Sequence, residues 1–482
     1  MSTWNPSLAD VATVVAGQNP WQSSGVVPEA LARSVERPLG QSLWRAVTAP
    51  APRRYQLILG PRRVGKSTVM YQTVRRLLVE GIPPERLWFL RLDHPVLLQL
   101  DLGELISVVR RAAGDPVDDL FVFLDELVYA ENWDTWLKTF YDEHAPVHIV
   151  ASSSASAALS RRRTESGVGR WEEQQLAPYL LSEYADLTAP GTTISVGETL
   201  AESVGTLGGG PRRDAAALER VRDRLMVTGG FPEIATLASD DVDSLAFESQ
   251  RILRADAVER AVYKDIPQSY GVSDPMALER LLYVLAGQMT GTLSTQGIAQ
   301  TLGSTQPTVD AYTRYLEAAF LVFRLPNYSG RESSIQRRGR KLYFVDGAVR
   351  NAALQRGNRF LSDPGERGVL IENMVASHLK GLADQVGVRL FHWRDGRDEV
   401  DLVYDDPNGP LAIEVASSAS HHHRGLVRFR ERHPQFSTWL TFPTAPWIPP
   451  ERTDDHVGTV PTDLLLLMIG RQAERALRER LS

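Results

Sequence analysis

One short stretch constrains this chain more than any other: an apolar run at 57–59, a glycine-rich loop, and a helical pattern after it. The loop opens at Gly60 and satisfies G-x-x-x-x-G-K-[ST], with Gly65, Lys66 and Ser67 in the required places. Apolar residues then recur at helical spacing through 69–78. Strand, loop and helix in this order predict a phosphate-binding loop, because backbone N–H groups of the loop and of the helix start can hold an anion.

The loop also predicts separate roles for its residues. Lys66 would reach the outer phosphates as a point charge and count among the catalytic residues, and the Ser67 hydroxyl would ligate Mg²⁺. The expected ligands are therefore ATP and Mg²⁺. The residues expected to bind the nucleotide are Gly60, Pro61, Arg62, Arg63, Val64, Gly65, Lys66, Ser67 and Thr68.

Two further apolar runs predict strands that complete this site. The run at 120–124 stops at Asp125 and Glu126, the Walker B pattern, in which the first carboxylate supports Mg²⁺ and the second takes a proton from the attacking water. A third strand is expected at 147–150, before a serine-rich turn. Ser153, at its tip, is the candidate for sensing the γ-phosphate and is grouped with the catalytic residues. A plain turn at this place is the open alternative.

Composition bounds the rest of the chain. With 482 residues, the chain is too long to fold around a single hydrophobic core. Its net charge of −6 argues against a uniformly basic nucleic-acid binder but leaves a local basic patch open. The absence of cysteine excludes disulfides, cysteine-ligated zinc and cysteine nucleophiles. No secretory signal pattern opens the chain, and the late apolar run at 464–469 falls short of the roughly 20 residues that span a bilayer. We expect a cytoplasmic protein with no membrane segment.

Seven motifs in order resemble one family. They are G-P-R-R-V-G-K-S-T, L-D-E-L followed by N-W, A-S-S-S-A, G-R at 169–170, G-G-F-P-E at 229–233, K-L-Y-F-V-D at 341–346 and L-I-E-N-M-V-A at 370–376. This set, from about residue 35 to 445, resembles prokaryotic AAA-type P-loop ATPases with a C-terminal domain of unknown function. That domain has a restriction-endonuclease-like, PD-(D/E)XK-like core.

The resemblance adds one candidate to the nucleotide site. It implies that Arg170, in the G-R pair, touches a nucleotide in its own subunit or in a neighbouring one, so a homo-oligomer is open. A surface arginine is the equal alternative.

The middle of the chain predicts a helix-turn-helix within 278–325, with Gly303 at the turn. Its second helix offers Gln306, Asp310 and Arg314, a set that does not support base-specific readout. The basic segment that runs from Arg331 to Lys341 lies where a wing would be and could contact DNA phosphates. The alternative is a winged helix used for packing or for contact with a protein partner.

The C-terminal part resembles the nuclease core but lacks one residue of it. Asp401 and Glu414, on successive predicted strands, match the metal-binding carboxylates, and Glu372 matches an acid on the preceding helix. Two positions after Glu414, where the pattern has lysine, this chain has Ala416. Lys380 on the helix is one conceivable replacement. We expect the nuclease fold with its catalysis lost or weak, and a domain that still binds DNA or a partner.

The histidine run that begins at His421 is expected to be a solvated loop rather than a metal site, because three successive side chains cannot face one ion.

Together these patterns predict an α/β chain: a P-loop NTPase parallel sheet flanked by helices, a helical and winged-helix region, and a smaller α/β nuclease-like domain. The expected segments are an N-terminal extension 1–33, an ATPase core 34–190, a helical lid 191–265, a winged-helix-like domain 266–347 and a nuclease-like domain 348–482. The expected activity is Mg²⁺-dependent ATP hydrolysis that controls the later domains. A slow nucleotide-gated switch and, less favoured, an active metal-dependent DNase are the alternatives.

Overall fold

The computed structural model describes residues 6–49, 53–114, 119–154, 169–189, 191, 194–206, 215–239, 241–329, 339–418 and 422–479. The chain divides into two compact units. Unit 1 comprises Met1–Gly60, Gly65–Leu176 and Leu477–Ser482, and unit 2 comprises Pro61–Val64 and Ala177–Ala476. The finer division into five segments stays a prediction.

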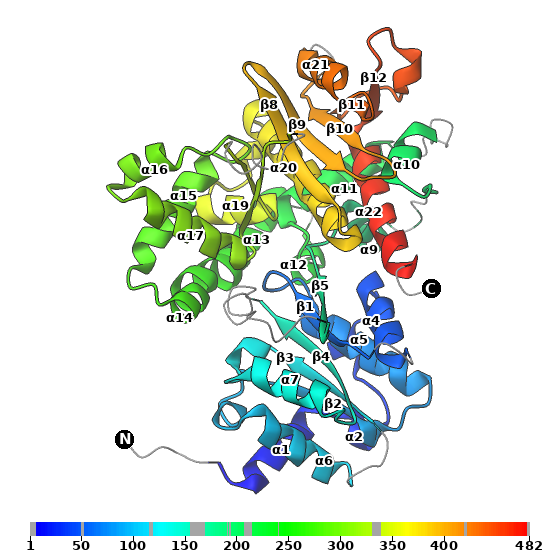
Figure 1. The fold of residues 1–482 in the computed structure, drawn as a ribbon, viewed down its shortest axis with the longest axis vertical. Helices are drawn as coiled ribbons and strands as arrows, with labels where there is room; N and C mark the ends of the chain where they lie inside the picture. Colours follow the sequence, from blue (N-terminus) through cyan, green and yellow to red (C-terminus); the bar gives the residue numbers. More distant parts are fainter. Residues whose placement is uncertain are drawn as a thin grey trace. The chain divides into compact units, whose positions relative to one another are not determined.

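Unit 1 is built on a five-stranded sheet in which all neighbouring strands are parallel (Figure 1). The spatial order is β2-β3-β4-β1-β5. The three apolar runs of the sequence form its middle, where the side chains are almost all buried, as a parallel sheet covered on both faces requires. The strands are β1 (Tyr55–Leu59), β2 (Leu87–Arg91), β3 (Leu120–Asp125), β4 (Val147–Ser153) and β5 (Trp171–Gln175).

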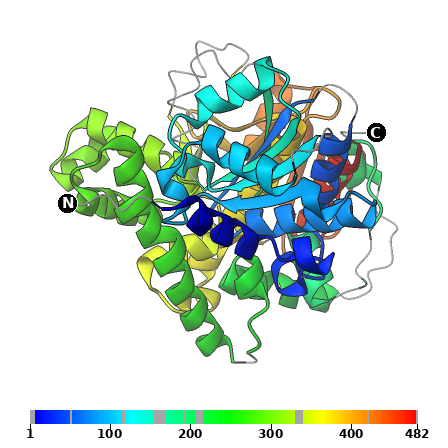
Figure 2. The same ribbon diagram turned by 90° about the horizontal axis from the view of Figure 1, so that it is seen from below.

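Helices cover both faces of this sheet. From β1 the chain crosses the sheet to the edge strand β2, and it then returns in the opposite direction through β3 to β4. Because such crossovers are right-handed, the two directions place their helices on opposite faces: α5 on one, α6 and α7 on the other (Figure 2). α4 packs against α5. These helices are α4 (Pro38–Thr48), α5 (Lys66–Val79), α6 (Leu102–Ala112) and α7 (Trp133–Asp142). The carboxyl ends of β1, β3 and β4 therefore lie side by side at one edge of the sheet.

The segment predicted to be an N-terminal extension belongs to unit 1 and covers the free edge of β2. The amide of Asn19 donates to the carbonyl oxygen of Phe89 (2.9 Å) and accepts from its N–H (2.6 Å). The Trp21 indole donates to the carbonyl of Leu87 (2.9 Å). An edge strand exposes unpaired backbone groups, so these side chains protect the sheet from pairing with another strand. The short helices here are α1 (Leu8–Gln18), α2 (Trp21–Ser24) and α3 (Glu29–Ala32).

Unit 2 begins with a helical region and continues into three helices and a two-stranded antiparallel sheet, β6-β7. Gly303, with φ +60°, ends α16 in the left-handed conformation and forms the predicted turn before α17. The helices are α9 (Leu181–Thr188), α10 (Leu200–Thr206), α11 (Ala215–Thr228), α12 (Pro232–Ala235), α13 (Val242–Leu253), two π-helical stretches (Arg254–Glu259 and Ala261–Asp265), α14 (Ile266–Tyr270), α15 (Pro275–Gly287), α16 (Thr295–Leu302) and α17 (Gln306–Ala318); the strands are β6 (Val322–Leu325) and β7 (Lys341–Phe344).

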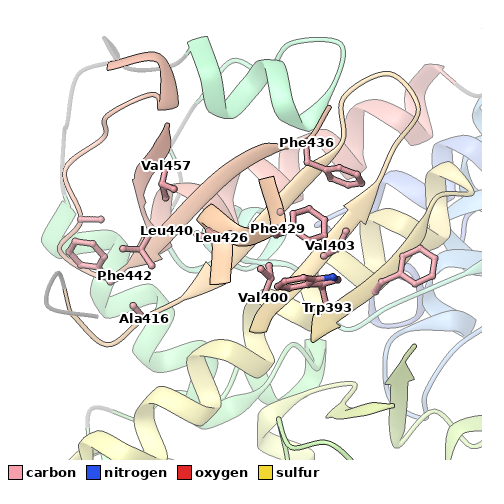
Figure 3. Packing of buried hydrophobic residues seen from close by; sticks show 13 residues of the cluster. Trp393, Val400, Val403, Ala416, Leu426, Phe429, Phe436, Leu440, Phe442 and Val457 are labelled. Carbon is pink, nitrogen blue, oxygen red and sulfur yellow. The ribbon is translucent and has the colours of Figure 1, made fainter. Parts of the chain in front are cut away.

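The last part of unit 2 is a smaller, mixed sheet in the order β12-β11-β10-β9-β8. β8, β9 and β10 pair antiparallel, and β10, β11 and β12 pair parallel. The long helix α20 packs along β8, β9 and β10, and α21 packs over an apolar cluster that includes Trp393, Phe429 and Phe442 (Figure 3). The elements are α19 (Gly347–Leu354), α20 (Pro364–Val386), β8 (Arg389–Asp395), β9 (Asp398–Asp405), β10 (Leu411–Val415), α21 (Arg424–Arg432), β11 (Ser437–Phe442), β12 (Val457–Pro461) and α22 (Thr462–Glu479).

Candidate nucleotide site and a second polar cluster

The predicted phosphate loop connects β1 to α5. Gly65 precedes the helix with φ +93° and ψ 26°, a conformation that glycine adopts at no steric cost. Lys66 is the first helical residue and is 6% exposed, and its ammonium donates to the carbonyl oxygen of Gly60 across the loop (2.9 Å). The lysine therefore lies within the loop, as its expected role requires.

Ser67 and Asp125 lie within hydrogen-bonding distance at the same edge of the sheet. The Ser67 hydroxyl donates to Asp125 Oδ2 (2.7 Å), although the two residues are 58 positions apart. A hydroxyl and a carboxylate are the hard oxygen ligands that Mg²⁺ takes beside phosphate oxygens. The donor set at this position therefore fits the metal that the sequence predicts.

Two serines, one near the end of β4 and one directly after it, position both Walker B carboxylates. The Ser152 hydroxyl donates to Asp125 Oδ1 and accepts from the N–H of Glu126 (3.1 Å). The Ser154 hydroxyl donates to Glu126 Oε2 (2.9 Å). The predicted sensor, Ser153, is buried at the end of β4 and lies opposite Leu59 of β1 in the register, whereas its two neighbours provide these bonds. Their role was missed because the serine run alone does not show which members face β3.

Glu126 has an unusual backbone. Its φ of +58° and ψ of 53° lie in the left-handed region, which costs an ordinary residue roughly 1–3 kcal/mol. Such conformations cluster at functional sites. Two non-glycine residues of the predicted site have a positive φ: Arg63 in the loop (+66°) and Glu126, the predicted catalytic base.

The remaining loop residues are divided between the units. Within unit 2, Arg62 forms a two-pronged ion pair with Asp265 (2.6 and 2.7 Å), and Arg63 pairs with Asp256 (2.6 Å) and with Glu233. Pro61 and Val64 are buried, and Thr68 lies in the first turn of α5. The guanidinium groups of both arginines are thus engaged by carboxylates.

Arg170 directly precedes β5 and lies where the strands of the first sheet begin, opposite the ends from which the phosphate loop extends. Its carbonyl oxygen accepts from the N–H of Tyr55 (3.1 Å), at the start of β1, whereas the phosphate loop follows the end of that strand. At about 3.3 Å per residue the separation along β1 is roughly 15 Å. The guanidinium forms a two-pronged ion pair with Asp142 (2.7 and 3.1 Å). This position lies away from the phosphate loop, and contact of Arg170 with a nucleotide, in its own subunit or in a neighbouring one, stays a prediction.

A second polar cluster lies in unit 2, where the structure brings Lys341 to the predicted nuclease carboxylates. The Lys341 ammonium is 2.7 Å from Asp401 Oδ1, 2.9 Å from Glu372 Oε1 and 2.9 Å from Glu399 Oε1. Burial, with the nearby Asp401 charge, raises the pKa of Glu372. Burial alone would lower the pKa of Lys341, but the surrounding acidic groups raise it well above its usual value. The lysine therefore remains a cation.

The same lysine corrects the prediction of a basic wing. Residues 330–338, which include Arg331, Arg337 and Arg338, lie outside the described residues. Lys341 is 3% exposed and surrounded by carboxylates, so it does not reach DNA phosphates as predicted. Of the predicted wing cations in the described part, Arg340 is half-buried.

Glu414 and Ala416 lie on or beside β10. Continuing the antiparallel register by one residue places Glu414 opposite Asp401, and the N–H of Val415 donates to Asp401 Oδ2 (2.9 Å). Ala416 is buried in the apolar cluster of Figure 3, so the position that the nuclease pattern assigns to lysine is occupied by core packing.

The other candidates for this region lie elsewhere. Lys380 pairs with Asp384 on its own helix. Of the histidine run, His421 lies outside the described residues, and His423 pairs with Asp455 (2.5 Å). Across the described ranges, no group of three or more histidine, aspartate or glutamate side chains is arranged to hold a metal ion.

Three motifs of the family resemblance contact one another in unit 2. Tyr343 donates to Glu372 (3.0 Å), and Asn373 accepts from the N–H of Phe344 (2.8 Å), so K-L-Y-F-V-D and L-I-E-N-M-V-A are bonded together. Asp346 accepts from the N–H of Gly230 in G-G-F-P-E (2.7 Å), and burial raises its pKa to about 6. These motifs form the framework of unit 2.

Comparison with known families agrees with the geometry of unit 1. A model for an AAA domain matches residues 52–185. This stretch is therefore similar in sequence to AAA domains, and unit 1 has the parallel sheet and phosphate loop of a P-loop NTPase fold. Models for two domains of unknown function, DUF8612 and DUF4143, match residues 219–359 and 367–442. No helix in the described part of the chain is long and apolar enough to cross a membrane.

Similar proteins extend over most of the chain at low identity. Two uncharacterized proteins of Methanocaldococcus jannaschii are 22% identical over 75% of this chain and 74% of their own, and 24% identical over 67% of each. Among solved structures, the ORC1 protein of Aeropyrum pernix in complex with DNA is 16% identical and covers 70% of this chain and 97% of its own, with a TM-score of 0.31. AMPPCP-bound DnaA from Aquifex aeolicus is 15% identical, covers 62% and 92%, and has a TM-score of 0.25. Because these similarities are distant, function has to be inferred from the residues of this chain itself.

Proposed function

We propose that the AAA domain binds ATP with Mg²⁺ and hydrolyses it. The observation that carries this proposal is the hydrogen bond between Ser67 and Asp125 at the carboxyl edge of the parallel sheet. It brings the loop hydroxyl and the Walker B carboxylate together from distant parts of the sequence. A chance motif match would have no reason to produce that pairing.

Each residue at this edge has a distinct task. The loop amides and Lys66 bind and neutralise the phosphates. Ser67 and Asp125 hold Mg²⁺, which when bound neutralises charge that develops on the phosphate oxygens. Glu126 orients the attacking water and accepts its proton.

Ser154 determines where the Glu126 carboxylate points. Its hydroxyl donates to Glu126 Oε2 at 2.9 Å, and its N–H approaches the same oxygen at 3.4 Å. Because one oxygen of the carboxylate is fixed in this way, the direction of the other is restricted. Ser154 therefore replaces Ser153 as our candidate for coupling β4 to the catalytic base.

The same contact favours a second function, a nucleotide-gated switch with slow turnover. A carboxylate bonded to Ser154 is not free to move toward water, so ATP would stay bound until a partner rearranges β4. Ser154→Ala separates the two functions. If Ser154 orients the base for catalysis, the variant loses about tenfold or more in kcat; if it restrains the base, basal turnover rises. Ser107→Ala, which removes an exposed hydroxyl of α6, is the control, with little change expected in either case.

Nucleotide binding is tested first in the intact protein with a fluorescent ATP analogue. Lys66→Ala should weaken binding at least tenfold, because it removes the buried point charge of the loop. Lys380→Ala, which removes a lysine of unit 2, should leave it unchanged. Equal affinity in all three proteins would refute the site.

A DNA or protein partner for unit 2 is also a proposal. Gln306 and Arg314 are exposed on α17, and Gln306 is already bonded to Thr295 of α16 (3.0 Å). One exposed cation on this helix gives weak support for a phosphate contact, so a protein partner is our first choice. Duplex DNA added to the turnover assay decides between them, since only a DNA partner would change kcat in a salt-dependent manner.

A further inference from the structure

The cluster around Lys341 has an arrangement that none of its sequence motifs predicts. Three carboxylates from two elements converge on a single point, Glu372 from α20 and Glu399 and Asp401 from alternate positions of β9. Residues two apart in a strand face the same side of the sheet, which explains the pair from β9. The point where all three meet is the ammonium nitrogen of Lys341.

The charges of this cluster favour a cation. The side chains of Lys341, Asp401 and Glu372 are 3%, 13% and 15% exposed, so water solvates them poorly. Carboxylates this close repel one another unless one of them takes up a proton, as the raised pKa of Glu372 favours, or a positive charge lies between them. Removing the partner of a buried charge is strongly destabilising. The Tyr343 hydroxyl donates to Glu372 as well, but it is neutral and cannot balance the charge. Lys341 provides the balance.

We propose that Lys341 is the resident cation of this carboxylate site, where it takes the place of a divalent metal ion and excludes one. The two cannot be bound together. Lys341 contacts the oxygens at 2.7–2.9 Å, and Ca²⁺ takes carboxylate oxygens at about 2.3–2.6 Å, so both would occupy the same few cubic ångströms. A metal enters only if the lysine leaves.

The position of Lys341 gives this exchange a structural consequence. It is the first residue of β7, which pairs with β6 and follows the helices α15, α16 and α17. The lysine therefore joins this helical region to the sheet of the C-terminal part by an internal ion cluster rather than by a metal. The Ala416 position contributes apolar packing in place of a charged side chain.

The test uses the full chain without nucleotide and Ca²⁺ as the probe, with calorimetric titration and thermal unfolding in calcium or in chelator. The wild-type protein should bind no Ca²⁺ at this site and show equal melting temperatures in both. Lys341→Met should gain one site, with a dissociation constant on the order of 10⁻⁴–10⁻³ M, and a melting temperature that rises with Ca²⁺. Adding Asp401→Asn should abolish the gain. Lys380→Met, which removes a lysine paired with a single carboxylate, is the matched control and should gain nothing.

Three results would overturn the proposal. One is Ca²⁺ binding by the wild-type protein that Asp401→Asn removes. Another is a folded Lys341→Met protein that gains no Ca²⁺ site. If Lys341→Met does not fold, the neutralised variant that adds Asp401→Asn and Glu372→Gln should fold, because the unbalanced charge is gone; failure of this variant as well is the third contrary result. If the neutralised variant folds and Lys341→Met does not, the result supports the proposal.

Discussion

The buried amide of Asn19 joins the N-terminal segment to the edge of β2, and Asn19→Leu tests how much unit 1 depends on it. Asn19 is 1% exposed and bonds both backbone groups of Phe89, at 2.6 and 2.9 Å. Leucine has similar volume but leaves the N–H and the carbonyl of Phe89 without this partner, and it also removes the bond from the Asn19 amide to the carbonyl of Val15 (2.7 Å). Each buried, unsatisfied group costs about 1–3 kcal/mol, so the expected loss of unfolding free energy is about 2–6 kcal/mol.

Denaturant unfolding of the full chain measures this loss. Two units need not unfold together, so the transition of unit 1 is identified as the one that ATP with Mg²⁺ shifts to higher denaturant. Gln18→Leu is the matched control. Gln18 bonds the N–H of Arg91 (2.8 Å), but Arg91 is exposed and water can replace the bond, so a loss below about 1 kcal/mol is expected. Equal losses for the two variants would refute the assignment of Asn19 as the structural cap of the sheet.

Three further predictions concern the site and unit 2. Asp125→Asn should remove most of the increase in ATP affinity that Mg²⁺ produces, because the charged partner of Ser67 is lost. The expected loss of affinity in the presence of Mg²⁺ is about 10–100-fold, measured by binding titration with and without the metal. An unchanged dependence on Mg²⁺ would contradict the site. Arg170→Ala should change ATP affinity by less than about twofold, since Arg170 lies at the opposite edge of the sheet, and a larger change would refute that placement. Burial lowers the pKa of His378 to about 4. Between about pH 6.5 and 4 only the unfolded chain binds the proton, so unit 2 should lose about 3 kcal/mol of unfolding free energy as the pH falls through this range. His378→Gln should reduce this loss in denaturant titrations at several pH values, and an unchanged pH dependence would contradict the buried neutral imidazole.

The sequence predicts the centre of unit 1 well because its signals are local. An apolar run followed by G-x-x-x-x-G-K-S determines β1, the loop and α5 within a single window of the sequence. The Asp125–Glu126 pair directly follows β3, and parallel strands bring their carboxyl ends to one edge. The pairing of Ser67 with Asp125 then follows from topology.

Other features depend on register or on distant pairing, which one sequence does not reveal. The run of serines from 152 to 154 identifies the end of β4, but the alternation of side chains decides that Ser152 and Ser154 bond to the carboxylates. Lys341 appears in the sequence as the end of a basic stretch. Only the fold shows that three carboxylates surround it.

The sequence predicts an N-terminal segment separate from the ATPase core because its composition is mixed and prolines interrupt it at positions 6, 20 and 28. Its bonds to β2 come from polar side chains that reach a strand about 70 positions away, and no periodicity predicts that. A signal was present, since Asn19, Trp21 and Gln22 are hydrogen-bonding residues close together. Nothing in the sequence identifies their partner.

The most direct test of the account is ATP turnover by the purified protein with Mg²⁺, beside Glu126→Gln. Glutamine preserves size and an oxygen for the bond from Ser154 but cannot accept the proton of the attacking water. The account predicts measurable turnover that falls about 10²–10⁴-fold in the variant, with ATP affinity unchanged within about twofold. Equal turnover in the two proteins, or tight ATP binding by the wild type without hydrolysis, would contradict the assignment of Glu126 as the base of an ATPase.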